Sequence, residues 1–196
     1  MSKASTILGQ SKRLLLRRPE DSDLEAIAAL WADPAATEHI GGPRDRGMIL
    51  DSFRQYAADP DTFAQQEGER WWSIVERSSG ALIGLCSLLE KEVAGQIETE
   101  IGYYLLPAHW GRGYATEAAH LVVEHAFNAL QLSSLVAIIH PQNAASIAVA
   151  GRLGMWLERE VPRPDGVVRQ VYRLRRRDPE WPGIRSGQTA SPEKPR

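Results

Sequence analysis

The sequence predicts one α/β domain built on a mixed sheet of about seven strands. Strand-like and helix-like segments follow one another as a strand, two helices, three strands, a helix, a strand, a helix and two strands. The chain has 196 residues, the usual size of a single domain, and 43% of them are hydrophobic, enough for a sizeable core. Charged residues make up 24%, as in an ordinary globular protein.

The N-terminal half is expected to begin with a strand at residues 12–17, where three leucines lie between basic residues. Asp21 or Ser22 then caps a helix with apolar residues at helical spacing, and this helix ends at Asp33, because the residue before a proline avoids helical geometry. A second helix is expected over residues 44–58, with its apolar side chains on one side.

Three strands and a glycine-rich turn follow. Turn residues at 78–80 separate two strands that form a hairpin, and Pro107 ends the third strand. Gly154 marks the end of the last helix, because glycine accepts the left-handed conformation that closes many helices. The remaining elements are expected as strands at residues 71–76, 81–90, 96–106, 135–140, 156–161 and 167–175, and as helices from the turn at 109–115 to about 130 and over 143–153.

The domain boundaries follow from composition. Residues 1–11 are small and polar and are expected to form a flexible N-terminus, and residues 12–177 form the folded domain. Residues 178–196 carry four of the 12 prolines and little apolar content, which predicts a disordered C-terminal tail.

Composition also excludes several classes of function. A formal net charge of -2 does not favour a nucleic-acid binder. The single cysteine, Cys86, permits no internal disulfide and no thiolate metal cluster, and its apolar surroundings predict a buried, unreactive thiol. No apolar stretch approaches the ~20 residues of a membrane span, and residues 1–10 lack the apolar centre of a secretory signal. We therefore expect a cytoplasmic protein without a metal, a membrane contact or a nucleic-acid partner.

The turn between the third consecutive strand and the following helix carries the most information. Gly111 and Gly113 stand just before a helix, whose first N–H groups have no internal acceptors and carry partial positive charge. Glycines let the chain turn tightly and let a ligand approach the backbone, so this turn suits a pyrophosphate, and Arg112 adds a positive charge. A tight turn without a ligand is the alternative. The Rossmann fingerprint is excluded because residue 116 is threonine, and the P-loop is excluded because Gly-Lys-Ser/Thr is absent.

A resemblance to a known family adds to this interpretation. Residues 101–118, Ile-Gly-Tyr-Tyr-Leu-Leu-Pro-Ala-His-Trp-Gly-Arg-Gly-Tyr-Ala-Thr-Glu-Ala, resemble the acetyl-coenzyme A motif of GNAT-superfamily acetyltransferases. They are most similar to the RimJ/RimL-like branch, which acetylates protein N-termini and other amines, and residues 14–23 and 143–155 resemble the same branch. The resemblance covers about residues 12–175. Trp110 departs from the superfamily pattern Gln/Arg-x-x-Gly-x-Gly/Ala, although binding through backbone amides does not need the first side chain.

The resemblance implies a GNAT fold, with a mostly antiparallel central sheet, a splayed parallel strand pair and flanking helices. It implies that acetyl-coenzyme A inserts its pantetheine arm between the two splayed strands and rests its pyrophosphate on the glycine turn. The N–H group near Leu105 would polarise the thioester carbonyl, a catalytic role. The residues implied in cofactor binding are Tyr104, Leu105, Leu106, Trp110, Gly111, Arg112, Gly113, Tyr114, Ala115 and Asn143.

Two carboxylates are candidates for the general base that deprotonates the amine. Glu98 and Glu100 lie two residues apart on one strand and therefore share a face. Glu100 is nearer to the expected thioester, and we favour it as the base, acting through water. The alternative is that both carboxylates form ion pairs or face solvent.

The usual proton donor to the departing thiolate is absent from this sequence. Many superfamily members carry a tyrosine four residues before the helix-ending glycine, and here that position is Ala150. Ser146 is the substitute that the RimJ/RimL-like branch suggests, although Asn143 and Ser146 could serve only to cap a helix.

The expected reaction is N-acetyl transfer to a primary amine, by direct attack in a ternary complex. The acceptor could be a protein N-terminal amine or a small-molecule amine, held in a groove formed by about residues 39–46 and 163–167, whose mixed charges select no substrate. The alternative is a non-catalytic sensor of acyl-coenzyme A, suggested by Ala150. Homodimers are common in this superfamily, and the sequence argues neither for nor against one.

Overall fold

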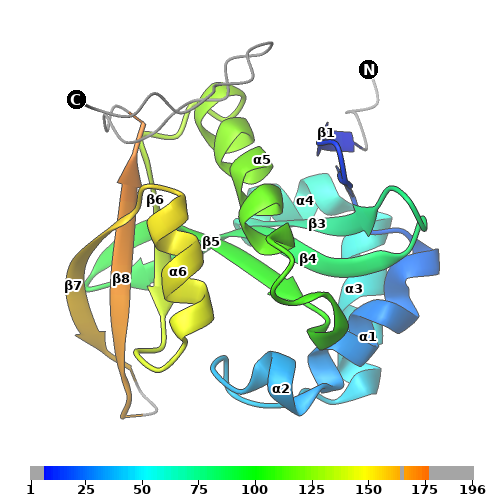
Figure 1. Ribbon diagram of the computed structural model, residues 1–196, viewed down its shortest axis with the longest axis horizontal. Helices are drawn as coiled ribbons and strands as arrows, with labels where there is room; N and C mark the ends of the chain where they lie inside the picture. The colour runs from blue at the N-terminus through cyan, green and yellow to red at the C-terminus, as the bar shows by residue number, and fades with distance from the viewer. Residues whose placement is uncertain (1–6, 164–165, 177–196) are drawn as a thin grey trace, which may run out of the picture.

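The computed structural model describes residues 7–163 and 166–176, and within them eight strands form one sheet (Figure 1). Their order across the sheet is β1-β2-β3-β4-β5-β6-β8-β7, and every neighbouring pair is antiparallel except β5 and β6, which are parallel. The mixed, mostly antiparallel sheet is confirmed, with one strand more than expected. The strands are β1 (Ile7–Gln10), β2 (Leu14–Arg17), β3 (Glu69–Glu76), β4 (Leu82–Val93), β5 (Gln96–Leu105), β6 (Ser134–Ile139), β7 (Trp156–Pro162) and β8 (Val168–Arg175).

The helices cover both faces of the sheet. Figure 1 shows α5 and α6 in front of it and α3 and α4 behind it. The α-helices are α1 (Leu24–Ala32), α2 (Pro34–Thr37), α3 (Arg46–Ala58), α4 (Pro60–Gln66), α5 (Tyr114–Asn128) and α6 (Ala144–Arg152), and 3-10 turns lie at Asp21–Asp23 and Pro107–His109.

The short helices α2 and α4 were not expected from the sequence. Each begins with an Asp-Pro pair, in which the aspartate caps the helix and the proline takes its first position. Asp33 accepts from the N–H of Ala36, and Asp59 accepts from the N–H of Thr62. Asp-Pro at the end of one helix is therefore also the start of the next, because proline needs no acceptor at the first helical position.

The first strand corrects the expected N-terminus. Residues 7–10 pair with β2, so the prediction of a flexible segment over residues 1–11 is wrong for these four. They carry only two apolar residues, and Leu8 packs against the main core. Their strand depends on the neighbouring edge of β2, which local composition does not reveal. Residues 1–6 and the predicted tail at 178–196 lie outside the described residues.

Side chains alternate along the central strands and feed two cores, one on each face. Ile101 and Leu105 of β5 pack with the buried sides of α5 and α6. Tyr104 faces the opposite way and packs with α1 and α3. Strand β5 therefore presents chemically different side chains to the two faces of the sheet.

Candidate active site

The parallel pair β5 and β6 separates almost at once, and a cavity opens between the two strands. The only register pair between them is Glu100 with Val136. Beyond it, towards the ends of both strands, lies a cavity of about 1080 Å³. We call it the cofactor slot; its walls are β5 from Glu100 to Leu105, β6 from Ala137 to His140, the first turn of α5, and α6.

The edge of β5 that faces this slot carries an N–H group from Leu105. The N–H of Leu106 donates to Ile83 of β4 at 3.0 Å. Successive N–H groups of a strand point to opposite edges, so the N–H of Leu105 points away from β4, toward the side that β6 has left. This orientation agrees with the polarising role expected for Leu105.

The glycine turn borders the slot in the conformation that the sequence suggested. Gly111 and Gly113 have φ angles of 72° and 78°, which glycine adopts at little cost. Among the described residues, the backbone N–H groups of residues 111–116 have no acceptor, whereas the next one, that of Glu117, donates to the carbonyl of Gly113 at 3.1 Å. The turn thus presents a row of unpaired donors at a positively polarised helix end, which fits a pyrophosphate.

Several side-chain contacts hold this turn in place. Arg13 donates to the carbonyl of Arg112 at 2.9 Å and forms an ion pair with Glu117, which also accepts from Ser11. The indole N–H of Trp110 donates to the carbonyl of Leu105 at 2.8 Å. Trp110 therefore ties the turn to the end of β5 and does not need to act on a ligand itself.

The hydroxyl of Tyr114 points to a structural partner: it donates to Glu76 at 2.6 Å, and the guanidinium of Arg13 lies 4.5 Å from the centre of its ring. Tyr114 can contribute its backbone N–H to the slot while its side chain anchors α5 against β3. In the same way, the acidic residue in the first turn, Glu117, is occupied by Arg13.

The other expected cofactor residues divide into two groups. Tyr104, Ala115 and Asn143 line the slot, as does Ser146. Leu106 and Arg112 do not line it; the side chain of Leu106 packs with the α1 and α3 core. Asn143 also caps α6, since its side chain accepts from the N–H of Ser146 at 3.0 Å.

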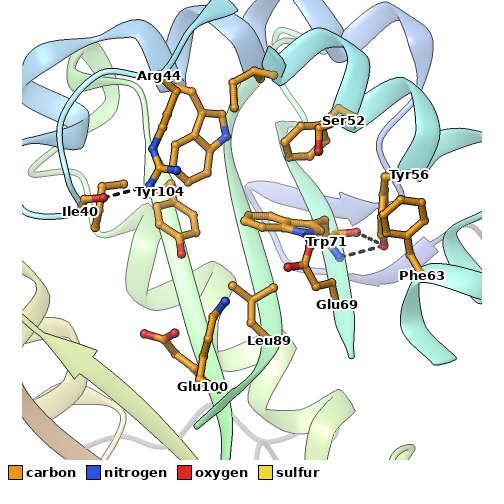
Figure 2. A pocket seen from close by; sticks show the side chains of 14 residues that line it. Ile40, Arg44, Ser52, Tyr56, Phe63, Glu69, Trp71, Leu89, Glu100 and Tyr104 are labelled. Carbon is orange, nitrogen blue, oxygen red and sulfur yellow. Dashed lines mark hydrogen bonds between the residues drawn. The ribbon is translucent and has the colours of Figure 1, made fainter. Parts of the chain in front are cut away.

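A second cavity of about 380 Å³ lies on the opposite face of β5, among α1, α3, β3 and β4 (Figure 2). We call it the aromatic pocket. Glu100 and Tyr104 line both the aromatic pocket and the cofactor slot. A molecule in one cavity would therefore meet a molecule in the other beside these two side chains.

Glu98 and Glu100 share a face, as expected, but their surroundings differ. Glu98 is held by Arg173, with one contact of 2.6 Å, so the ion-pair alternative is the correct one for Glu98. Glu100 forms no ion pair within the described residues. Burial raises the pKa of Glu100 to about 7, against the opposing effects of Lys91, Arg163 and the N–H of Ile138. A carboxyl with such a pKa is suited to exchange protons at neutral pH.

Of the two segments expected to form the acceptor groove, one contributes to the aromatic pocket. Ile40 and Arg44, from the segment 39–46, line the aromatic pocket. None of the described residues of the segment 163–167 lines it, and Pro164 and Asp165 lie outside the described residues. The aromatic pocket is instead closed by α3, β3 and β4.

Two side-chain contacts in the slot, and most residues of the aromatic pocket, were not predicted from the sequence. Tyr103 donates its hydroxyl to the carbonyl of Ser146 at 3.0 Å and so connects β5 to α6 across the slot. The rings of His39 and His140 stack 5.1 Å apart where both line the slot. The aromatic residues of the second pocket looked like ordinary core residues, and no local pattern separated them from core.

Cys86 is fully buried, and burial raises the pKa of its thiol further above the ordinary range, so the expectation of an unreactive thiol is confirmed. Within the described residues, no group of three or more His, Cys, Asp and Glu side chains is arranged to hold a metal ion. None of the helices in that part of the chain is long and apolar enough to span a bilayer.

A splayed parallel pair, a row of unpaired amides and a buried carboxyl between two cavities fit an acyltransferase that uses acetyl-coenzyme A. Comparison with known proteins gives the family. The family model of the GNAT acetyltransferase domain matches residues 13–156, so the chain belongs to the GNAT acetyltransferases.

Relatives and solved structures agree with this assignment. The chain is 32% identical over 168 residues to the uncharacterized N-acetyltransferase YoaA of Bacillus subtilis, covering 82% of this chain and 85% of the relative. An acetyltransferase from Agrobacterium tumefaciens superposes with a TM-score of 0.71 at 31% identity, covering 89% of this chain and 95% of that one. The ribosomal L7/L12 α-N-protein acetyltransferase RimL shares the fold, with a TM-score of 0.70 at 18% identity over 88% of this chain and 96% of its own.

Proposed function

We propose that the protein transfers an acetyl group from acetyl-coenzyme A directly to a primary amine, with both substrates bound at once. The observation that carries this proposal is the position of Glu100, which lines the slot and the aromatic pocket together. The co-substrate supplies an activated acetyl thioester from the side of the slot. The amine approaches from the aromatic pocket.

Glu100 acts as the general base in this proposal. An amine is a nucleophile only when neutral, and a lysine-like amine has a pKa of about 10.4. Its proton must therefore be removed at neutral pH. A carboxyl whose pKa burial has raised to about 7 holds such a proton better than an ordinary glutamate, and it can act directly or through one water.

The backbone binds and orients the co-substrate. The unpaired N–H groups of residues 111–116 can hold the pyrophosphate, and the exposed edge of β5 can pair with the pantetheine amides. The N–H of Leu105 then donates to the acetyl carbonyl oxygen, where negative charge develops. Asn143 and Ser146 close the slot from α6, and Ser146 is our candidate for the proton donor to the thiolate.

Direct transfer is favoured over a covalent acyl-enzyme. Cys86 is the only cysteine of the chain, and it is fully buried in the core. No cysteine thiolate can therefore reach the slot as a nucleophile.

Initial-rate kinetics test this proposal. With the release of free coenzyme A followed in a thiol assay, and both substrates varied, a ternary mechanism gives intersecting double-reciprocal lines, whereas an acyl-enzyme gives parallel ones. Mass spectrometry of the acceptor must show one added acetyl group. Binding of acetyl-coenzyme A without release of free coenzyme A, over a wide panel of amines, would instead support a non-catalytic sensor.

A further inference from the structure

The aromatic pocket has a floor made by three strands in register. Glu69 of β3 pairs with Leu89 of β4, and Leu89 pairs with Glu100 of β5. The three side chains therefore stand in one row across the sheet, on one face. Two strand spacings separate the backbones of Glu69 and Glu100 by about 10 Å.

Both ends of this row carry a carboxyl group that forms no ion pair with another described residue, although Lys91 lines the same pocket and its charge lowers the pKa of Glu100. Glu69 accepts the indole N–H of Trp71 at 3.2 Å, and it forms no ion pair with any other described residue. Glu100 likewise forms none. Figure 2 shows both carboxyl groups beside Leu89, with the aromatic rings beyond them. An unpaired carboxylate in a half-buried site is costly. A ligand with a hydrogen-bond donor at each end would pair with both carboxyl groups and remove this cost.

Six aromatic rings make up much of the wall above this row, and the rest of it consists of Ile40, Arg44, Ile49, Ser52 and Lys91. The rings of Trp31, Trp71 and Tyr104 lie 5.1 to 6.1 Å from one another, and Phe53 lies 5.4 Å from Trp71. Such faces bind flat, apolar bodies and offer few partners for the amides of a peptide. The volume of about 380 Å³ is at the small end of known ligand sites.

We propose that the acceptor is a small primary amine on a flat apolar body with a hydrogen-bond donor at its far end, bound with the amine at Glu100 and the donor at Glu69. This inference rests on the proposed function, since it names the acceptor class of the same reaction. The flat body lies between the Glu69–Leu89–Glu100 row and the ring of Trp71.

The test compares four acceptors in the same acetylation assay: tyramine, phenethylamine, putrescine and a short peptide with a free N-terminus. Tyramine carries the flat body and the distal donor, phenethylamine lacks the donor, and putrescine lacks the flat body. We expect kcat/KM for tyramine to exceed that for putrescine and for the peptide by about tenfold or more. Equal or higher values for the peptide or for putrescine would overturn the inference.

The variant Glu69→Gln locates the distal donor. It should raise KM for tyramine about tenfold, because a hydrogen bond to a charged group is lost, and its effect on phenethylamine should be at least fivefold smaller. Glu92→Gln is the matched control, since Glu92 is exposed on β4 and lines neither cavity. An equal effect of Glu69→Gln on both amines would contradict the placement of the donor. Phe53→Leu provides a second, independent variant, which should weaken both ring-bearing amines and leave putrescine unaffected.

Direct binding separates this inference from the proposed function. Titration calorimetry of tyramine into the protein with coenzyme A requires no turnover. If tyramine binds and Glu69→Gln weakens that binding about tenfold, but no amine is acetylated, the pocket assignment stands and the proposed transfer fails. If a peptide is acetylated and tyramine neither binds nor reacts, the transfer stands and this inference fails.

Discussion

The two cavities on either side of β5 are built in different ways. The cofactor slot offers a ligand backbone N–H groups, from the edge of β5, the glycine turn and the first turn of α5. The aromatic pocket is made of side chains from six helices and strands (α1, α3, α4, β3, β4 and β5) and from the segment between α2 and α3. A site made of backbone serves a ligand shared by a whole family, whereas a site made of side chains can select one acceptor. Substitutions in one cavity should therefore change the binding of its own substrate and leave the binding of the other substrate unchanged.

The largest effect is expected at Glu100, one of the two residues that line both cavities. Glu100→Gln should lower kcat by roughly 100- to 1000-fold, the range usual for a general base, with little change in the Kd of acetyl-coenzyme A. In the wild type, kcat/KM should rise with pH and level off above about pH 7, and the variant should lack this rise. Glu98→Gln is the control: it breaks an ion pair with Arg173 and should retain the pH dependence.

The same variant should change stability in the opposite direction to activity. The pKa of Glu100 is raised from 4.5 to about 7, so the folded protein binds more protons than the unfolded chain between these values. The free energy of unfolding therefore falls as the pH rises through this window. Glu100→Gln removes that loss, so its Tm should exceed that of the wild type at pH 8 and approach it near pH 4. A lower Tm at pH 8 would show that Glu100 is stabilised by contacts other than those described.

The next effect tests the slot alone. Gly113→Val forces a branched side chain onto a φ of 78°, which costs about 1–2 kcal/mol and displaces the amides beside it. We expect the Kd of acetyl-coenzyme A to rise roughly 10- to 100-fold, since hydrogen bonds to a charged group are lost. Gly80→Val carries the same strain at a φ of 70° in the turn between β3 and β4. It should lower Tm and leave the Kd unchanged; a similar loss of binding in both variants would point to general destabilisation.

A smaller effect is expected at Gly102 of β5, the strand that lies between the two cavities. A Cβ at Gly102 would lie 2.5 Å from the hydroxyl of Tyr104 and from Oγ of Ser87, so Gly102→Ala must displace the phenol. Steady-state kinetics should show a rise of about tenfold in KM for the amine and less than twofold in KM for acetyl-coenzyme A, the range of one lost contact. Gly151→Ala, in α6 with open space around it, should change neither constant. Equal rises in both KM values for Gly102→Ala would mean that Tyr104 serves the slot more than the pocket.

The smallest effect is expected for the proton donor. Ser146→Ala should lower kcat about threefold to tenfold, because water can replace a hydroxyl at the mouth of an open slot. Asn143 caps α6 through the N–H of Ser146, and that contact is unchanged by the substitution, so Tm should stay within about 2 °C of the wild type. An unchanged kcat and pH profile would show that Ser146 is not the proton donor and has only a structural role in α6.

The long helix and the glycine turn before it could be predicted because their signals are local, whereas the residues of the slot were implied by the family resemblance, and Leu106 and Arg112 among them do not line it. The first N–H groups of a helix have no acceptor within the helix, whatever the rest of the fold, so a glycine pair before a helix predicts unpaired amides. The signal of α2 and α4 was present too, in two Asp-Pro pairs: the pair at 33–34 was interpreted only as a helix end, and the pair at 59–60 was overlooked. Strand β1 was missed because its stability comes from its neighbour in the sheet and not from its own four residues.

The sequence by itself determined the glycine turn before α5, since that turn is a property of one continuous stretch of backbone. Only the tertiary structure decided which of two similar carboxylates is held by Arg173 and which stands between the cavities. It also decided that Glu69, more than thirty residues away in the chain, shares a row with Glu100. The physical reason is strand register: a slip of one residue would carry either side chain to the other face of the sheet, and nothing in the local sequence fixes that register.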